Sequence, residues 1–373
     1  MGEPDNQYIP VYKPWLTNLE REYVLDCLDS TWISSKGQYI ERFEREFANY
    51  VGARHAVAVC NGTVAVHLTL LGLGIGPGDE VIVPTLTFIA SVNPIIYCGA
   101  TPVFVDSDPN TWQMDPIDVA RKIGPRTKAI MVVHLYGHPA NMEALQKLAD
   151  RTGVRIIEDC AEAIGSRIQG RHVGGFGDIA AFSLFGNKTI TTGEGGMVVT
   201  NSDDLHDLVV RLKGQGLAAN RVYWHDLVGY NYRMTNICAA IGCAQMTRIH
   251  QIVDSKYELA NRYRRRINKL EGVVMHECQD DHFVHSYWMV TVLVRRGTRD
   301  RVMAFMREKG IETRPVFYPL HQMPMYRHYG AVCPVADELG ERGINLPSWP
   351  RLSDAELTRI VDALAQGVAH ENP

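Results

Sequence analysis

The chain has 373 residues, of which 46% are hydrophobic and 21% charged, with a formal net charge of −4. This is the composition of a globular protein of two or three domains, and it excludes a disordered or fibrous chain. The small net charge, with no long run of one sign, argues against a nucleic-acid-binding surface built on bulk charge.

The eight cysteines form no C-x-x-C pair, so we expect free thiols in a reducing compartment. The N-terminal sequence lacks the apolar core of a signal peptide. Residues 81–105 carry no charge over a length that could span a membrane, but Pro84, Pro94 and Pro102 interrupt them. We interpret this stretch as a strand, a short helix and a strand, and we expect a soluble, cytoplasmic protein without a membrane partner.

From about residue 55, short apolar runs alternate with longer amphipathic ones. The predicted strands are residues 55–60, the end of 76–84, 101–106, 128–137, 154–159, 179–185 and 196–201. The predicted helices between them include residues 63–74, 142–153 and 204–216. Near-continuous apolar strands separated by helices indicate an α/β fold with a mostly parallel sheet covered by helices on both faces.

The pattern changes after residue 245. We expect a long charged helix at 246–270, a strand at 287–294 and helices at 299–310 and 354–368. These elements indicate a smaller α+β unit. The predicted organisation is therefore an N-terminal arm (1–25), a large domain (26–245) and a small C-terminal domain (246–373).

Asn61, Gly62 and Thr63 lie between a predicted strand and a predicted helix. A helix N-terminus offers unpaired N–H groups that can hold a phosphate, and glycine permits close backbone approach. An ordinary capped turn is the alternative, and the local sequence alone favours it.

Asp159 ends the predicted strand at 154–159, with Glu158 and Glu162 close by in sequence. Ligands of α/β proteins bind at the carboxyl ends of parallel strands, so this carboxylate cluster is a candidate site. A solvated carboxylate that caps the next helix explains Asp159 about equally well.

Lys188 is one of ten lysines and lies between an apolar strand and the glycine-rich sequence TTGEGG. Burial lowers the pKa of a lysine toward the reactive neutral amine, which can form a Schiff base. A nucleotide P-loop would need glycine directly before the lysine, where Asn187 stands. A surface lysine is the other alternative, and the apolar flanks argue against it.

The histidines form no H-E-x-x-H motif and no Cys/His quartet, so no metal site is expected. Most of them are expected to be structural or exposed.

In chain order, these motifs resemble the DegT family of sugar aminotransferases. The matching blocks are residues 31–68, 76–91, 158–166, 182–197 and 229–242. The resemblance implies the fold-type-I aspartate-aminotransferase scaffold with pyridoxal phosphate as cofactor. It also implies a homodimer with shared active sites.

The resemblance assigns roles to particular residues. Lys188 would hold the cofactor as a Schiff base and then move a proton as base and acid. Asp159 would pair with the pyridinium nitrogen and keep it protonated. The other implied contacts are Gly62, Thr63 and Ser183 with the phosphate, Phe88 with the ring face, Glu162 near the 3-hydroxyl, Asn231 with the neighbouring subunit's cofactor and His321 with the sugar nucleotide.

The implied reaction is amination of a nucleotide-linked 4-keto-6-deoxy sugar by L-glutamate. The sequences FGNKTITTGEGGM (185–197) and RPVFYPLH (314–321) are most similar to members that convert GDP-4-keto-6-deoxy-D-mannose to GDP-perosamine, for O-antigen (lipopolysaccharide) or related glycans. Lysine at 188 favours transamination, because sugar-dehydrating relatives carry histidine there. Glutamate at 162 departs from the glutamine that is frequent in the family.

Two alternatives remain open at this point. One is an aminotransferase for a dTDP- or UDP-linked keto sugar or a keto-cyclitol. The other is a non-catalytic regulator that binds pyridoxal phosphate.

Overall fold

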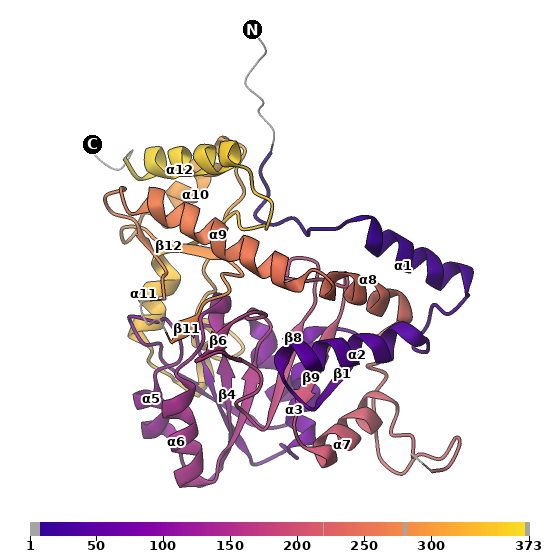
Figure 1. The fold of residues 1–373 in the computed structure, drawn as a ribbon. Coiled ribbons are helices and arrows are strands. Elements are labelled where there is room, and N and C mark those ends of the chain that lie inside the picture. The colour runs from indigo at the N-terminus through magenta and orange to yellow at the C-terminus, as the bar shows by residue number, and fades with distance from the viewer. Residues whose placement is uncertain (1–7, 219, 279–281, 370–373) are drawn as a thin grey trace.

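The computed structural model describes residues 8–218, 220–278 and 282–369 (Figure 1). The first seven residues of the expected arm and the last four of the expected C-terminal domain lie outside this range. The expected domain boundaries stay a prediction.

A seven-stranded sheet forms the centre of the fold, in the order β1-β9-β8-β5-β4-β2-β3. Only β9 runs antiparallel to its neighbours in this sheet, which confirms the mostly parallel prediction. The strands are β1 (His55–Val59), β2 (Glu80–Pro84), β3 (Thr101–Val105), β4 (Thr127–Val133), β5 (Arg155–Asp159), β8 (Ile179–Ser183) and β9 (Gly196–Thr200).

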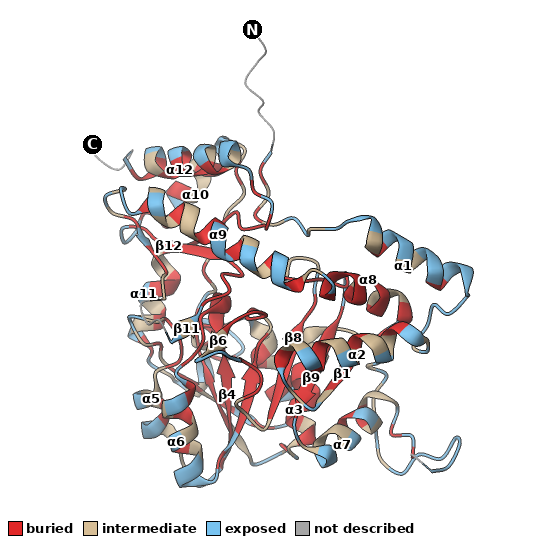
Figure 2. Cartoon of the chain, in the orientation of Figure 1, coloured by how far each residue is buried: buried red, intermediate tan, exposed pale blue. Residues whose placement is uncertain are grey.

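Helices cover both faces of this sheet, as predicted. Alternate residues of β1 show the arrangement, because Ala56 and Ala58 pack with α2 and α8, whereas Val57 and Val59 pack with α3 and α7. Figure 2 shows the sheet buried between helices whose outer faces are exposed. The helices of this region are α2 (Gln38–Val51), α3 (Gly62–Gly72), η1 (Ile89–Ser91), α4 (Asn93–Tyr97), α5 (Pro116–Lys122), η2 (Leu135–Gly137), α6 (Met142–Thr152), α7 (Asp203–Lys213) and α8 (Asn236–Met246).

The C-terminal part contains a four-stranded antiparallel sheet in the order β10-β12-β14-β13. Its strands are β10 (Val274–Met275), β12 (Val290–Leu293), β13 (Arg314–Pro315) and β14 (Gly343–Leu346). Its helices are α9 (Ile249–Ile267), α10 (Arg299–Glu308), η3 (Leu320–Gln322), η4 (Arg327–Tyr329), α11 (Pro334–Arg342) and α12 (Asp354–Ala369). A short sheet of β6 (Arg167–Ile168), β7 (Arg171–His172) and β11 (Phe283–Val284) connects this part to the large one.

The N-terminal segment contains helix α1 (Asn18–Asp29), which begins at a capping box formed by Thr17 and Glu20. Before this helix, Ile9 pairs with Ile311 of the C-terminal part. None of the helices in the described ranges is both long and apolar enough to cross a membrane.

Candidate active site

The carboxyl ends of the neighbouring strands β5 and β8 carry two predicted site residues. Asp159 is the last residue of β5 and Ser183 the last of β8. The strands run parallel with Asp159 opposite Ala181, so both side chains lie at the same edge of the sheet. This edge is where α/β proteins bind their ligands.

Asp159 is buried, and two hydrogen bonds orient its carboxylate. Ser91 Oγ donates to Oδ2 at 2.7 Å, and the Ala161 N–H donates to Oδ1 at 3.0 Å. Thr87 Oγ1 lies 2.9 Å from Ser91 Oγ and supports the serine in turn. Each carboxylate oxygen can accept another hydrogen bond, so Asp159 can still pair with a protonated ring nitrogen.

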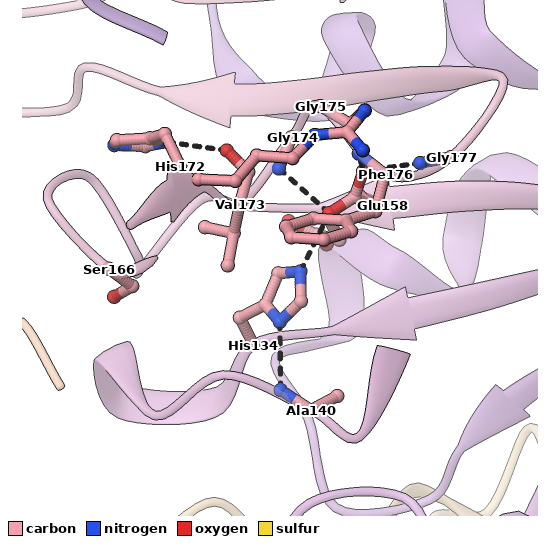
Figure 3. Close-up of polar contacts among 12 residues, drawn as sticks. His134, Ala140, Glu158, Ser166, His172, Val173, Gly174, Gly175, Phe176 and Gly177 are labelled. Atoms are coloured by element: carbon pink, nitrogen blue, oxygen red, sulfur yellow. Dashed lines mark hydrogen bonds and ion pairs between the residues drawn. The ribbon is translucent and has the colours of Figure 1, made fainter. Parts of the chain in front are cut away.

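Glu158 does not join this site, contrary to the predicted carboxylate cluster. Successive side chains of a strand point to opposite faces, so Glu158 leaves β5 on the other side from Asp159. Its carboxylate accepts backbone N–H groups from Gly174, Phe176 and Gly177, and it lies 3.1 Å from His134 Nε2 (Figure 3). Burial raises the pKa of Glu158, but these contacts outweigh it and leave the pKa below its usual value.

His134 and Glu158 also belong to a group of side chains with the spacing of metal ligands. His134, Glu158 and Cys160 bring possible ligand atoms within 4.8 Å of one another. The Ala140 N–H donates to His134 Nδ1, so the ring proton is on Nε2 and points to Glu158 (Figure 3). The His134 and Glu158 atoms are engaged in hydrogen bonds within the protein, and Glu158 anchors the turn at 174–177.

Lys188 lies beyond β8, and its side chain is only 11% exposed. Its Nζ is 3.8 Å from Glu162 Oε1. Burial lowers the pKa of Lys188, while the charges of Glu162 and Asp159 partly oppose that shift. The lysine therefore gives up its proton more readily than an exposed lysine, as a Schiff-base lysine must.

Glu162 faces the lysine from the segment after β5. The Tyr136 N–H donates to its Oε2 at 2.8 Å. Burial raises the pKa of Glu162 to about 7, against the opposing charge of Lys188. Glu162 therefore holds a proton more readily than an ordinary glutamate does.

The start of α3 packs tightly against the end of β8. A Cβ on Gly62 would lie 2.7 Å from Ser183 Cβ, so only glycine fits at this position. Gly62 and Thr63 open the helix after the Asn61 cap, and their N–H groups have no intrahelical acceptor. Backbone N–H groups and the Ser183 hydroxyl therefore converge on a place suited to a phosphate.

The remaining predicted residues have different surroundings. Phe88 is 52% exposed, with its ring centroid 5.6 Å from that of Phe317, so its ring can still stack on a ligand. His321 Nδ1 lies 2.8 Å from Thr85 Oγ1 and its Nε2 lies 3.3 Å from Asp337 Oδ1, which fixes the imidazole above the end of β2.

Asn231 is exposed, and its side-chain oxygen accepts from Arg233 Nη2 at 3.1 Å. Its role toward a second subunit stays a prediction.

These features fit the cofactor that the sequence implied. The buried amine of Lys188 suits the aldehyde of pyridoxal phosphate, and the oriented carboxylate of Asp159 suits its ring nitrogen. The N-terminus of α3 suits its phosphate. Lys188, Asp159 and Gly62 come from three different segments, and the fold brings them to one sheet edge.

Sequence reasoning missed three residues around this site. Ser91 contacts Asp159, Trp288 places its ring 3.8 Å from Lys188 Nζ, and Tyr12 donates its hydroxyl hydrogen to the Lys188 carbonyl at 2.8 Å. Ser91 could have been noticed as a hydroxyl four residues after Thr87 in an apolar run. Nothing in the local sequence marks Trp288 or Tyr12, because each is about 100 or more residues from Lys188.

Comparisons with known proteins identify the family of the chain. Residues 14–365 match the model of the DegT/DnrJ/EryC1/StrS aminotransferase family. The chain is 57% identical to a GDP-perosamine synthase of Escherichia coli O157:H7, covering 96% of this chain and 98% of that protein. A GDP-perosamine synthase of Vibrio cholerae is 50% identical, covering 95% and 98%.

The fold agrees as well. The crystal structure of the aminotransferase TlmJ from Streptoalloteichus hindustanus superposes with a TM-score of 0.93 at 31% identity, covering 97% of this chain and 99% of that one. The match spans both the central sheet and the C-terminal part. The chain therefore belongs to the DegT/DnrJ/EryC1/StrS aminotransferase family, whose members depend on pyridoxal phosphate.

Proposed function

We propose that this enzyme transfers the amino group of L-glutamate to the 4-keto carbon of GDP-4-keto-6-deoxy-D-mannose, which forms GDP-perosamine and 2-oxoglutarate. The proposal is supported by the names of the two relatives at 57% and 50% identity, each matched over nearly its whole length. The buried Lys188–Glu162 contact beside Asp159 is the observation that carries the chemistry.

Pyridoxal phosphate, when bound, supplies an aldehyde that condenses with amines and a ring that withdraws electrons from the reacting carbon. Burial lowers the pKa of Lys188, which makes its neutral amine more available to attack a carbonyl and to take a proton from a carbon beside nitrogen. Glu162, whose pKa is about 7, can accept or return that proton at neutral pH.

The other residues bind and orient. Asp159 would hold the ring nitrogen protonated, with Ser91 and the Ala161 N–H keeping its carboxylate in place. Gly62, Thr63 and Ser183 would hold the phosphate, and Phe88 would cover one face of the ring. His321, fixed by its two ring contacts, would contact the sugar nucleotide.

A panel of acceptors tests the substrate. The enzyme should aminate GDP-4-keto-6-deoxy-D-mannose with glutamate as donor, and turn over dTDP- and UDP-linked 4-keto sugars far more slowly. Activity only on the dTDP or UDP sugars, or on a keto-cyclitol, would contradict the GDP assignment. If the enzyme shows no half-reaction with glutamate, the non-catalytic alternative is favoured.

We also propose that the active enzyme is a homodimer. Leu25, Leu28 and Trp32 expose apolar surface on and after α1, and so do Tyr223 and Val228 in the segment after α7. Figure 1 shows α1 and this segment extending from the same side of the molecule. We infer that a second copy of this chain covers these exposed apolar side chains. Asn231 follows the segment after α7 and would then reach the partner's cofactor phosphate.

Mixed dimers test the shared site. Lys188→Ala would inactivate the enzyme, and Asn231→Ala would weaken cofactor binding through the partner subunit. A mixed dimer of the two would combine one doubly damaged site with one intact site. Recovered activity after subunit mixing supports sharing. No recovery, with mixed dimers confirmed by mass, contradicts it. We further expect the enzyme to act in the cytoplasm, where its eight cysteines would stay free.

A further inference from the structure

Trp288 contacts Lys188 in two ways. The lysine Nζ lies 3.8 Å from the centroid of the Trp288 ring, and the indole N–H donates to the Asn187 carbonyl at 2.7 Å. The tryptophan itself is only 5% exposed. One side chain therefore contacts both the amine and the backbone directly before the lysine.

Trp288 belongs to a different part of the fold from Lys188. It lies two residues before β12 of the C-terminal sheet, whereas Lys188 follows β8 of the central sheet. Its ring stacks with Tyr136 at 6.1 Å between centroids and 18° between planes. The backbone N–H of Tyr136 donates to the Glu162 carboxylate, which lies beside the Lys188 amine. Trp288 therefore also packs against the residue that orients Glu162.

A second buried lysine, Lys256 of α9, fixes Trp288. Its Nζ donates to the Trp288 carbonyl at 2.8 Å and to the Ser348 carbonyl, and it lies 5.1 Å from the centroid of the Tyr12 ring. The two carbonyl oxygens and the ring face accept from the Lys256 amine, while burial lowers its pKa well below the usual value. The Tyr12 hydroxyl in turn donates to the Lys188 carbonyl at 2.8 Å.

We propose that Trp288 is a positioning residue for Lys188: its ring supports the amine when the amine is not bonded to the cofactor, and Lys256 holds Trp288 in place. The proposal rests on the proposed cofactor role of Lys188. The ring face attracts a cation, so it favours the protonated amine, whereas burial disfavours it. The ionisable groups that face Lys188 are Glu162 and Asp159, with the Tyr12 hydroxyl at its carbonyl.

The pKa of the Lys188 amine in the full-length, cofactor-free protein tests this role. The rate of trace acetylation by acetic anhydride, followed against pH and located at Lys188 by peptide mass spectrometry, reports the neutral amine. In Trp288→Leu, which keeps an apolar side chain but removes the ring, the pKa of Lys188 should fall by about 0.5 to 1 unit. Trp288→Phe should lie between this variant and the wild type.

Trp112→Leu is the matched control, since it removes another buried tryptophan, one that stacks on His276. It should leave the pKa of Lys188 unchanged. Lys256→Met should shift the pKa of Lys188 in the same direction as Trp288→Leu, because it releases the Trp288 backbone. Thermal unfolding of each variant separates a general loss of stability from an effect on the amine.

The outcomes are distinct. An unchanged or raised pKa of Lys188 in Trp288→Leu, or an equal fall in Trp112→Leu, would overturn the positioning role. An unchanged pKa in Lys256→Met would overturn the part assigned to Lys256. The cofactor role of Lys188 is tested separately, by reducing the loaded enzyme and locating the bound cofactor. If the cofactor is found on another lysine, the proposed function fails, but the measured pKa of Lys188 still tests the role of Trp288.

Discussion

Ser91 Oγ donates a hydrogen bond to Oδ2 of Asp159 across 2.7 Å, and both side chains are buried. The contact joins the segment after β2 to the end of β5. Because the Ala161 N–H holds the other oxygen, the carboxylate has one orientation before any cofactor binds. A carboxylate that is oriented in advance loses less freedom when it pairs with the ring nitrogen.

Ser91→Ala should weaken both cofactor binding and turnover. A hydrogen bond to a charged group contributes about 1.5–3 kcal/mol, which corresponds to roughly a 10- to 150-fold loss. Titration of the cofactor-free protein with pyridoxal phosphate and measurement of kcat would show the change. Thr87→Val removes only the hydroxyl behind Ser91 and should cost less. Equal affinities for Ser91→Ala and the wild type would show that this contact does not orient Asp159.

Gly62→Ala should damage the phosphate site. The new Cβ would lie 2.7 Å from Ser183 Cβ, so the helix start or the strand end must move. Overpacking of this kind costs about 1–3 kcal/mol of stability, and the displaced N–H groups should raise the Kd for pyridoxal phosphate. Gly76→Ala is the control, because a Cβ there meets no atom within 4 Å. A Gly62→Ala variant with unchanged affinity would place the phosphate elsewhere.

Glu162 should make the stability of the cofactor-free protein depend on pH. Its pKa is about 7 in the folded chain, against 4.5 for a free glutamate. The folded state therefore binds more protons between these values, so the stabilisation is complete below pH 4.5 and is lost as the pH rises through about 7. The shift corresponds to about 3 kcal/mol.

Urea unfolding at pH 5 and pH 8 measures this dependence. The buried histidines His138, His172, His276 and His285, whose pKa values burial lowers, act in the opposite direction, but they do so equally in both proteins. The stability of the wild type relative to Glu162→Gln should therefore be greater at pH 5 than at pH 8 by about 3 kcal/mol, because the amide does not titrate. The exposed Glu271, whose side chain is 95% accessible, provides the control as Glu271→Gln. An unaltered pH dependence in Glu162→Gln would refute the assignment of the raised pKa to this residue.

The sequence predicted the central sheet because buried parallel strands are nearly continuous apolar runs. The strands β5 and β8 lie within the predicted ranges, and Asp159 and Lys188 lie at the sheet edge where ligands bind. The long helix α9 and strand β12 were also located. Local sequence sets these features, since apolar runs and their periodicity decide which elements form.

Local sequence shows that adjacent residues of a strand point to opposite faces, but not what each side chain meets there. Glu158 and Asp159 are adjacent, yet one anchors the turn at 174–177 and the other faces the site. That division depends on loops that meet only after folding. The support of Lys188 by Trp288 is likewise a contact across 100 positions of the chain. Packing between distant segments determines this contact, and no local pattern in a single sequence indicates it.

The central claim is that Lys188 is the lysine that holds the cofactor. Reduction of the loaded enzyme with borohydride, followed by peptide mapping, should place the reduced cofactor on the peptide containing Lys188 and on none containing the other nine lysines. Lys188→Ala should carry no covalent cofactor and show no turnover. Label on another lysine, such as the buried Lys256, or appreciable turnover by Lys188→Ala would contradict the account.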